Sequence, residues 1–411
     1  MNIPSLRFPE FKEEKNNPYK KHFFKDIFLF STGKNIKQNE ASPHFETPCV
    51  RYGELYHMYN EVITEVINKT NLDKVELLFS DGDEILLPSA GEDPLDIGSA
   101  SALTIKNVAI GRTINILKPA EENIYSQIYV AYYINHKLKK HISTLAKGVS
   151  ISNVYNSDLK TLEIILPNIE EQEKNASFFT AIEKKLQALK KKQNILEDYK
   201  KGVMQKLFSQ ELRFQDENGN EFPEWEEMRL EEVCKIARSG GTPTSTNKSF
   251  YNGDIPFLSI SDMTSQGKYL THTSNHISKL GLENSSSWLV PANSLIYSMY
   301  ASVGFVAINK IPIATSQAVL NLILKDEFDL EFMYYTLVDF QKNIAQFITT
   351  GTQGNLNAQS VKNFELKIPS LTEQIKISNF LSRIDEKIET VQSQIEKANI
   401  WKIGLMQKMF C

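Results

Sequence analysis

Hydrogen-bonding side chains gather in a few loops of the 411-residue chain. The second half contains Gly240–Tyr251 and Thr349–Gln359, which are rich in Thr, Ser, Asn, Gln and Lys and carry Gly where the backbone can be approached closely. The first half offers Gly33–Asn39, Lys137–His141 and Lys147–Asn153. Hydroxyl and backbone N–H groups contact phosphates, whereas Asn, Gln, Arg and Lys read the edges of bases. These residue types therefore point to contacts with nucleic acid.

The competing interpretation is that surface loops are polar in any protein, and it applies to each single residue. The basic run Lys190–Lys192 is equally open, because it could contact phosphates or form a solvated helix face. The candidate DNA contacts are Lys34, Asn35, Lys37, Lys147, Ser150, Asn153, Thr242, Thr244, Asn247, Lys248, Tyr251, Thr350, Thr352, Gln353, Asn355 and Asn357.

Motifs for catalysis or for binding a metal or a nucleotide are not found. The sequence has no Walker A loop and no G-x-G-x-x-G turn after a strand. Glu365–Lys367 lacks the upstream acid of a metal-dependent nuclease, and His272 and His276 lack the intervening Glu of His-Glu-x-x-His, so we interpret them as surface histidines. The cysteines are too far apart for a zinc site or a disulfide framework: Cys49, Cys234 and Cys411. We expect no catalytic, cofactor-binding or metal-binding residue in this chain.

Composition describes an ordinary globular protein. Hydrophobic residues make up 41% and charged residues 23% of the chain. No apolar run is long enough to cross a membrane, and the N-terminus lacks the apolar core of a signal peptide, so we expect a cytoplasmic location. The net charge of −4 does not favour binding to nucleic acid, although a basic face can coexist with an acidic remainder.

The loops must be positioned by a duplicated element. The stretch from Leu166 to Phe208 recurs from Ile368 to Phe410 without a gap, at a shift of 202 residues (368 − 166). Identities between the copies include Pro167/Pro369, Glu171/Glu373, Gln172/Gln374, Phe178/Phe380, Gly202/Gly404 and Met204–Lys206 with Met406–Lys408. Internal repeats of this length reflect architecture.

Each copy is predicted to form one long helix with a coiled-coil seam. A leading Pro marks the start, acidic residues occupy the first turn, and apolar residues follow at a spacing of three and four. Forty helical residues span about 60 Å, which is too long for the interior of a small domain. Gln193, Lys200 and Lys402 interrupt the seam and either fix its register or mark where another helix joins. The apolar seam residues are Phe179, Ile182, Leu186, Leu189, Leu196, Leu381, Ile384, Ile388, Val391 and Ile395.

Two related globular units flank these helices. Short β-rich runs are predicted at Val75–Phe79, Glu84–Leu87, Ile114–Leu117, Ile255–Ile260, Leu295–Tyr297, Phe305–Ile308 and Leu320–Leu324. Helices are predicted at Tyr125–Leu145 and Asp329–Ile348, and a strand precedes each long helix, at Leu162–Leu166 and Phe364–Ile368. The units match at Tyr132-Tyr133 with Tyr334-Tyr335, at Pro48–Glu54 with Pro256–Asp262, and at Phe8–Phe11 with Phe222–Trp225.

These patterns predict an α+β fold with two mixed α/β domains, linked and spaced by two long helices that pair antiparallel with pseudo-two-fold symmetry. Leu6-Arg7-Phe8 repeats Leu212-Arg213-Phe214, which follows the first helix, so the N-terminus should continue the C-terminal helix in a cyclic arrangement. The predicted boundaries are 1–166 for the first globular domain, 167–210 for the first helix, 211–221 for a linker, 222–367 for the second domain and 368–411 for the second helix.

The chain resembles the specificity (S) subunits of type I restriction-modification systems. Gly240-Gly241-Thr242-Pro243, then Tyr251, Ile255-Pro256-Phe257 and Ser261-Asp262-Met263 resemble the opening of a target-recognition domain. The repeated P-x-x-x-EQ…F…G-x-MQK-x-F helix is the second feature. The first domain departs from the pattern, because no Thr-Pro follows Gly33 and Gly53-Glu54 replaces Ser-Asp.

This resemblance implies a non-catalytic subunit that reads double-stranded DNA and organises a complex. Each target-recognition domain would read one half of a bipartite, asymmetric site, and the coiled coil would set the spacer. The implied partners are two modification subunits, which methylate adenine with S-adenosylmethionine, and restriction-translocation subunits, which use ATP and Mg²⁺. The alternative is a coiled-coil adaptor whose two heads bind protein or glycan.

Overall fold

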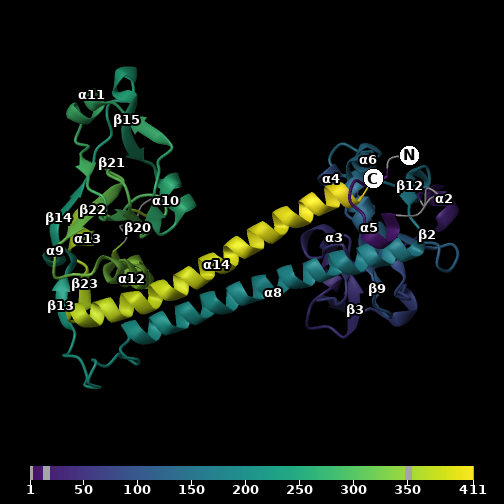
Figure 1. Ribbon diagram of the computed structural model, residues 1–411, viewed down its shortest axis with the longest axis horizontal. Coiled ribbons are helices and arrows are strands. Elements are labelled where there is room, and N and C mark those ends of the chain that lie inside the picture. Colours follow the sequence, from purple (N-terminus) through teal and green to yellow (C-terminus); the bar gives the residue numbers. More distant parts are fainter. Residues whose placement is uncertain (1–2, 13–18, 348–353, 411) are drawn as a thin grey trace. The chain divides into compact units, whose positions relative to one another are not determined.

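The computed structural model describes residues 3–12, 19–347 and 354–410. The chain divides into two compact units (Figure 1): unit 1 comprises Met1–Lys191 with Ser393–Cys411, and unit 2 comprises Lys192–Gln392. Each unit holds one α/β domain and part of each of two long helices, α8 (Ile169–Phe208) and α14 (Leu371–Met409). Within the described ranges, no helix has the length and apolar character needed to cross a membrane.

The domain of unit 1 is built on a five-stranded sheet in the order β2-β10-β6-β8-β4, in which β4 and β8 run parallel and the other neighbours antiparallel. A smaller sheet, β5-β3-β9, and the pairs β1-β12 and β7-β11 complete it. The strands are β1 (Lys20–Phe23), β2 (Phe28–Thr32), β3 (Thr47–Val50), β4 (Val62–Ile63), β5 (Lys69–Thr70), β6 (Glu84–Pro88), β7 (Ala90–Gly91), β8 (Ser101–Leu103), β9 (Ala109–Ile110), β10 (Ile114–Pro119), β11 (Ser152–Asn153) and β12 (Glu163–Leu166). The helices are α1 (Pro9–Lys12), α2 (Phe24–Ile27), η1 (Gln38–Glu40), α3 (Glu54–His57), η2 (Lys74–Glu76), α4 (Pro94–Ile97), α5 (Gln127–Tyr133), η3 (Ile134–Leu138), α6 (Lys139–Thr144) and α7 (Asn156–Leu159).

The domain of unit 2 has a five-stranded sheet in the order β14-β22-β19-β20-β16 and a second sheet in the order β17-β15-β21-β18, with β13 paired to β23. The strands are β13 (Glu226–Arg229), β14 (Cys234–Ser239), β15 (Tyr251–Leu258), β16 (Tyr269–Leu270), β17 (Asn275–Ile277), β18 (Leu289–Val290), β19 (Leu295–Ser298), β20 (Val306–Asn309), β21 (Ile313–Thr315), β22 (Val319–Leu324) and β23 (Glu365–Ile368). The helices are α9 (Leu230–Val233), η4 (Lys248–Phe250), α10 (Ile260–Gln266), α11 (Lys279–Glu283), α12 (Leu330–Phe340), η5 (Gln341–Phe347) and α13 (Ala358–Lys362).

The two domains share one topology, which confirms the predicted duplication. When the strands of each five-stranded sheet are numbered in chain order, both sheets have the strand order 1-5-3-4-2. The small sheets correspond as well, because β3 and β15 each lie between an antiparallel and a parallel neighbour. Cys49 pairs with Ala109 where Phe257 pairs with Ala314, so Pro48 is equivalent to Pro256, as the sequence match predicts.

Apolar runs form the central strands because both faces of the large sheets are covered. Every residue of β6 is buried, and so are the first four residues of β22. In unit 2 the sheet, α12 and the adjoining turns of the long helices share one hydrophobic cluster, which includes Leu207, Leu320, Phe332, Phe364 and Leu381. The core of the domain therefore continues into the helices.

Most predicted elements are present with shifted ends, but one predicted strand is wrong. Val75–Phe79 contains the 3₁₀ turn η2, in which the Asp73 carboxylate accepts a hydrogen bond from the Val75 N–H and the Val75 side chain is exposed. The cap satisfies a backbone donor locally, so an apolar run is not extended here. In Ile255–Ile260 the strand ends at Leu258, because Ser259 caps α10.

The predicted helix Tyr125–Leu145 is divided. A π-helical segment, η3, separates α5 from α6. The predicted match of Tyr132 with Tyr334 is also wrong by one residue. Ser126 caps α5 and Asp329 caps α12, and their N–H groups donate to the equivalent Gln172 and Gln374 side chains. Counting from the caps, Tyr132 corresponds to Tyr335.

The long helices pair antiparallel within each unit. In unit 1 the Phe179 ring, early in α8, stacks on the Phe410 ring just beyond α14, with centroids 5.6 Å apart. In unit 2 Leu207, late in α8, shares a core with Leu381, early in α14. Of the ten apolar seam residues, Phe179, Ile182, Leu186, Leu381, Ile384, Val391 and Ile395 are buried, and Leu189, Leu196 and Ile388 are half-buried.

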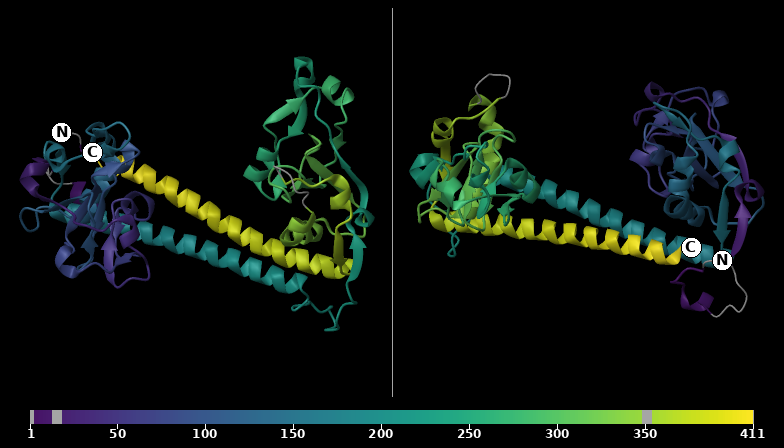
Figure 2. Two further views of the ribbon diagram at one scale, coloured as in Figure 1. Left: turned by 180° about the vertical axis from the view of Figure 1, so that it is seen from behind. Right: turned by 90° about the horizontal axis from the view of Figure 1, so that it is seen from above.

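The N-terminal segment follows the end of α14, and the two lie side by side (Figures 1 and 2). The Leu6 N–H donates to the Lys408 carbonyl oxygen at 3.0 Å, just as the Leu212 N–H donates to that of Lys206 at 3.1 Å. The Phe8 ring contacts that of Phe178, as the Phe214 ring contacts that of Phe380. The cyclic continuation predicted from Leu6-Arg7-Phe8 is thus present in unit 1.

Candidate nucleic-acid interface

The candidate loops begin at equivalent glycines after the first strand of each large sheet. A Cβ atom on Gly33 would lie 2.0 Å from the Gly111 carbonyl oxygen, and one on Gly240 would lie 1.9 Å from that of Thr315. Both positions therefore exclude any side chain. The first domain keeps this feature of the motif although it lacks the Thr-Pro that follows in the second.

In unit 1 the loop after Gly33 is held in an unusual backbone conformation. Asn35 and Ile36 both have positive φ angles, 49° and 52°, which is strained for a β-branched residue. The Ile36 side chain is buried, and the Asn35 amide donates to the Glu76 carbonyl oxygen at 2.7 Å. Lys34 and Lys37 are exposed on this loop, and Lys37 lies 3.9 Å from a Glu40 oxygen.

The second candidate loop of unit 1 is followed by a residue that contacts the strand before the first loop. Lys147 and Asn153 pair through their backbones, and the Lys147 ammonium contacts the Asp158 carboxylate at 2.7 Å. The Asn156 amide donates to the Ser31 carbonyl oxygen at 3.0 Å, just before Gly33. This hydrogen bond links the segment after the second loop to the strand before the first, and Ser150 is exposed on the second loop.

In unit 2 several candidate side chains have structural partners. The Thr242 hydroxyl donates to the Gln317 side chain at 2.9 Å, the Tyr251 hydroxyl donates to the Pro243 carbonyl oxygen at 2.6 Å, and Asn247 caps η4. Thr244 and Lys248 are exposed on the same loop.

The remaining candidates flank α13. Asn357 caps this helix by accepting a hydrogen bond from the Ser360 N–H at 2.7 Å, and Asn355 is half-buried. Thr350, Thr352 and Gln353 lie outside the described residues. Equivalent backbone bonds follow the second loop of each unit. They run from Leu356 N–H to Met299 O and from Met299 N–H to Ala318 O in unit 2, and from Val154 N–H to Ser89 O and from Ser89 N–H to Thr113 O in unit 1. DNA contact by these residues stays a prediction.

The Ser-Asp motif has a structural role that the sequence did not reveal. Asp262 is 3% exposed and accepts from the N–H and hydroxyl groups of Ser259 and Ser274. Burial opposes ionisation, but these four hydrogen bonds outweigh it and hold the pKa of Asp262 below its usual value. Glu54 takes the same place in the first domain, where the Arg51 side chain and the Asn68 amide contact it.

The repeated Glu-Gln at the start of each long helix has a similar explanation. Glu171 is buried and pairs with Arg7 at 2.6 Å, and Glu373 is buried and pairs with Arg213 at 2.9 Å. Gln172 and Gln374 donate to the carbonyl oxygens of Pro167 and Pro369. The repeated Leu-Arg-Phe was the sequence signal for these pairs.

The polar seam residues Lys200 and Lys402 bind the helices to each other and to the domains. In unit 2 Lys200 pairs with Asp385 at 2.6 Å and lies over the Tyr335 ring. In unit 1 Lys402 pairs with Glu183, reaches Glu61 at 3.5 Å and lies over the Tyr132 ring. The third polar residue, Gln193, donates to Glu197 on its own helix.

The domain residue that contacts the long helices has opposite charges in the two units. The contact between each domain and its lysine-carboxylate pair on the long helices is called the junction. Lys268, which precedes β16, occupies the position that Glu61 has before β4. It is almost buried and contacts Glu331 at 2.7 Å, the Tyr335 hydroxyl at 2.7 Å and Asp385 at 3.4 Å. Burial and the hydrogen bond to Asp385 raise the pKa of Tyr335.

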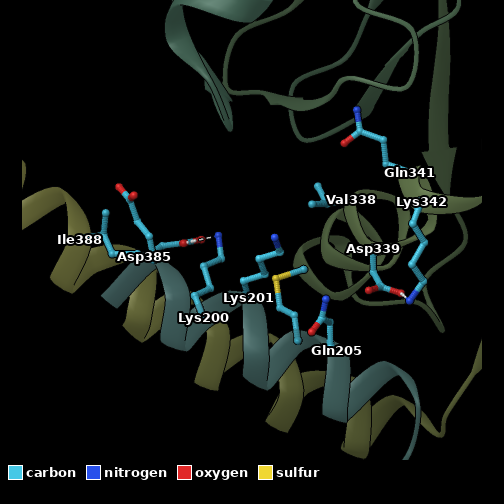
Figure 3. Close-up of a pocket in the computed structure, with 11 residues that line it drawn as sticks. Lys200, Lys201, Gln205, Val338, Asp339, Gln341, Lys342, Asp385 and Ile388 are labelled. Atoms are coloured by element: carbon cyan, nitrogen blue, oxygen red, sulfur yellow. Dashed lines mark hydrogen bonds and ion pairs between the residues drawn. The ribbon is translucent and has the colours of Figure 1, made fainter. Parts of the chain in front are cut away.

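A groove of about 690 Å³ lies beside this junction in unit 2, between the long helices, α12 and η5. Figure 3 shows Lys200, Lys201 and Gln205 of α8 on one side and Asp339 and Lys342 on the other. Lys342 pairs with Asp339 at 2.8 Å. Because the lining carries both signs of charge, the groove has no single electrostatic preference.

Comparison with known proteins places this architecture in a family. The sequence model described as "Type I restriction modification DNA specificity domain" matches residues 16–198 and again residues 223–399. The chain belongs to this family. The two matches coincide with the two copies of the module.

Two individual specificity subunits are similar to parts of the chain. The chain is 28% identical over 196 residues to the type I restriction enzyme MjaIX specificity subunit of Methanocaldococcus jannaschii, over 46% of this chain and 44% of the relative. It is 34% identical over 149 residues to the HindI specificity subunit of Haemophilus influenzae, over 36% of this chain and 32% of the relative. These alignments span less than half of either relative.

A solved structure shares the whole fold. The S subunit of a type I restriction-modification system from M. genitalium superposes with a TM-score of 0.65, over 100% of this chain and 99% of that chain. The sequence identity of 17% limits this likeness to the fold.

Proposed function

We propose that the chain is the specificity subunit of a type I restriction-modification system. Each domain reads one half of a bipartite, asymmetric DNA site, and the paired helices set the unread spacer. The observation that carries this proposal is the repetition, in one chain, of the same module, in which a polar loop follows an equivalent glycine after the first strand of the same sheet. The two copies differ in their exposed side chains, as readers of two different half-sites must.

The proposal assigns sequence reading to this chain and catalysis to its partners. Two modification subunits dock on the two similar modules, since a repeated surface presents similar sites to two copies of one partner. They bring S-adenosylmethionine and methylate adenine, and restriction-translocation subunits bring ATP and Mg²⁺. The complex works on double-stranded DNA in the cytoplasm.

The net charge of −4 is compatible with this role. The candidate loops carry exposed lysines at Lys34, Lys37 and Lys248, where they favour phosphate contact. Partner subunits supply the remaining positive charge around the duplex.

The test is co-expression of the full chain with its modification subunit, followed by mapping of methylated adenines in genomic DNA. The proposal expects methylation at one asymmetric motif made of two short half-sites and a spacer of fixed length. A complex that shows no sequence selection against random duplex DNA would overturn the proposal in favour of a coiled-coil adaptor for protein or glycan.

A further inference from the structure

A hollow of about 540 Å³ lies on the small sheet of unit 2. It is formed by β15, β17 and the residue before β17. Its lining combines aromatic rings with short polar side chains: Tyr251, Asn252, Gly253, Phe257, Ser274, Asn275 and His276. The loops that the sequence singled out contribute only Tyr251 to this hollow.

A β-bulge shapes one wall of the hollow. Tyr251 and Ile255 are both paired with Ile277, so residues 252–254 stand out of the ladder. Asn252 has a φ of 57°, and a Cβ atom on Gly253 would lie 2.4 Å from the Ser278 Cα atom. Bulges re-aim side chains and are common beside functional sites. The close backbone contact at Gly253 fixes this one.

The opposite wall follows from the strand register. His276 lies across from Pro256, and Asn275 lies across from Phe257. Asn252, Asn275 and His276 are exposed, and within the described residues their side chains make no hydrogen bond or ion pair. Three residues that line this hollow therefore carry side chains with free donors and acceptors.

The flanks of the hollow are fixed by hydrogen bonds. The Tyr251 hydroxyl donates to the Pro243 carbonyl oxygen, and the Ser274 N–H and hydroxyl groups both donate to Asp262. These hydrogen bonds hold the strands that carry the free side chains. A site built on strands and supported in this way keeps its geometry better than one on a free loop.

We infer that Asn252, Asn275 and His276 read base edges of one half-site in the major groove. This inference rests on the proposed function. A two-stranded ribbon fits the major groove, where an Asn amide can bond both N6 and N7 of adenine and an imidazole can bond an N7 or O6 acceptor. Lys248, in η4 before β15, and Lys279, after β17, are exposed at the ribbon ends for phosphate contact.

The first domain has the same device with different residues. Ser42 and Pro48 are both paired with Lys69, and Thr47 is paired with Thr70, so residues 43–46 stand out of the ladder as the corresponding bulge. Lys69 takes the place of His276, because each is paired with the equivalent proline. The scaffold is shared, and the side chains that it presents differ.

The experiment uses the full chain in complex with its modification subunit and a library of random duplex DNA. Selection followed by sequencing compares wild type with Asn252→Ala, Asn275→Ala and His276→Ala, and His272→Ala is the matched control. His272 is an exposed histidine four residues away that does not line the hollow. Circular dichroism and urea unfolding check that each variant is folded.

The inference expects at least one of the three variants to lose base preference at one or two positions of a single half-site. Discrimination there falls at least about fivefold, because a bidentate base contact is worth that much or more. The other half-site, the spacer and the slope of affinity against salt stay as in wild type, and His272→Ala changes nothing.

Folded variants that all select the unchanged motif would overturn the inference and leave the proposed function standing. So would a change confined to affinity, with equal loss on every sequence, because that is the signature of phosphate contact. A wild-type complex that selects no motif at all overturns the proposed function instead, so the two failures are distinguishable.

Discussion

At the scale of single residues, buried acids organise the module. Glu171 and Glu373 each take an arginine from the segment that follows the end of the other long helix, and Asp262 takes four donors from two serines. An unpaired buried carboxylate is costly, so these residues need their partners.

Removing one such partner should destabilise unit 2. Arg213→Ala leaves Glu373, which is fully buried, without its guanidinium, and we expect the free energy of unfolding to fall by roughly 3 kcal/mol in urea titrations. Lys235→Ala is the control, because Lys235 pairs with Asp326 on the surface and the expected loss is below about 1 kcal/mol. Equal losses in the two variants would contradict a special role for the buried pair.

The stability of unit 2 should depend on Asp262 in acid. Its pKa in the folded chain is lowered, so the carboxylate contributes stability above the unfolded value near 3.8, and this contribution is lost as the pH falls through the folded pKa. We expect urea unfolding from pH 7 to pH 3 to show a smaller acid-induced loss in Asp262→Asn than in wild type, from a lower starting stability. The exposed Asp254→Asn should keep the wild-type slope; if Asp262→Asn keeps it too, the acid sensitivity lies elsewhere.

At the scale of elements, periodicity was the strongest guide. The three-four spacing of apolar residues from Phe179 to Leu186 predicts α8, because a helix that packs along one face needs an apolar residue there at every turn. The strand predicted from Val75 is wrong because a capped turn satisfies the backbone N–H of that residue. The π-helical segment η3 was not predicted because such a segment has no clear sequence signature.

The hollow beside β15 was out of reach of sequence reasoning. His276 lies beside Asn252 only through a long-range register and a bulge, and neither is encoded by spacing. The four-residue spacing of His272 and His276 suggested only a comparison with a metal-binding motif. Once the register is known, the duplicated module identifies the differing residues, because Lys69 and His276 are the strand partners of Pro48 and Pro256.

Changing the length of the long helices should change the spacer. Adding one heptad to both α8 and α14 keeps the seam in register and lengthens each helix by about 10 Å, which corresponds to roughly 3 base pairs. Methylation mapping should show the same half-sites at a longer separation. Adding four residues instead rotates the seam and should lower stability, and altered half-sites in the heptad variant would rule out the ruler.

At the scale of the whole molecule, the chain is cyclic in its connections. The segment from Leu6 to Phe8 repeats the contacts of Leu212 to Phe214, so it lies beside the end of α14 as the continuous segment after α8 does in the other copy.

A circular permutant should therefore keep its function. Joining the two ends of this chain through a short Gly-Ser linker and opening the chain between Glu217 and Asn218, in an exposed turn, should change stability by less than about 1 kcal/mol and leave the methylated motif unchanged. Opening it beside Asn321, in the middle of the buried strand β22, is the control and should abolish folding. A Glu217 permutant that fails to fold would refute the equivalence of the two connections.

The reversed charge at the junctions shows that the same pair of helix residues can hold domains with different side chains. The helices offer a lysine beside a carboxylate at both places, Lys402 with Glu183 and Lys200 with Asp385. One domain engages its pair through Glu61, and the other through Lys268. Because each junction has both a lysine and a carboxylate on the helices, it can form an ion pair with a domain residue of either charge. A domain that carries either charge at this position can therefore pair with the same helices without a compensating change in them.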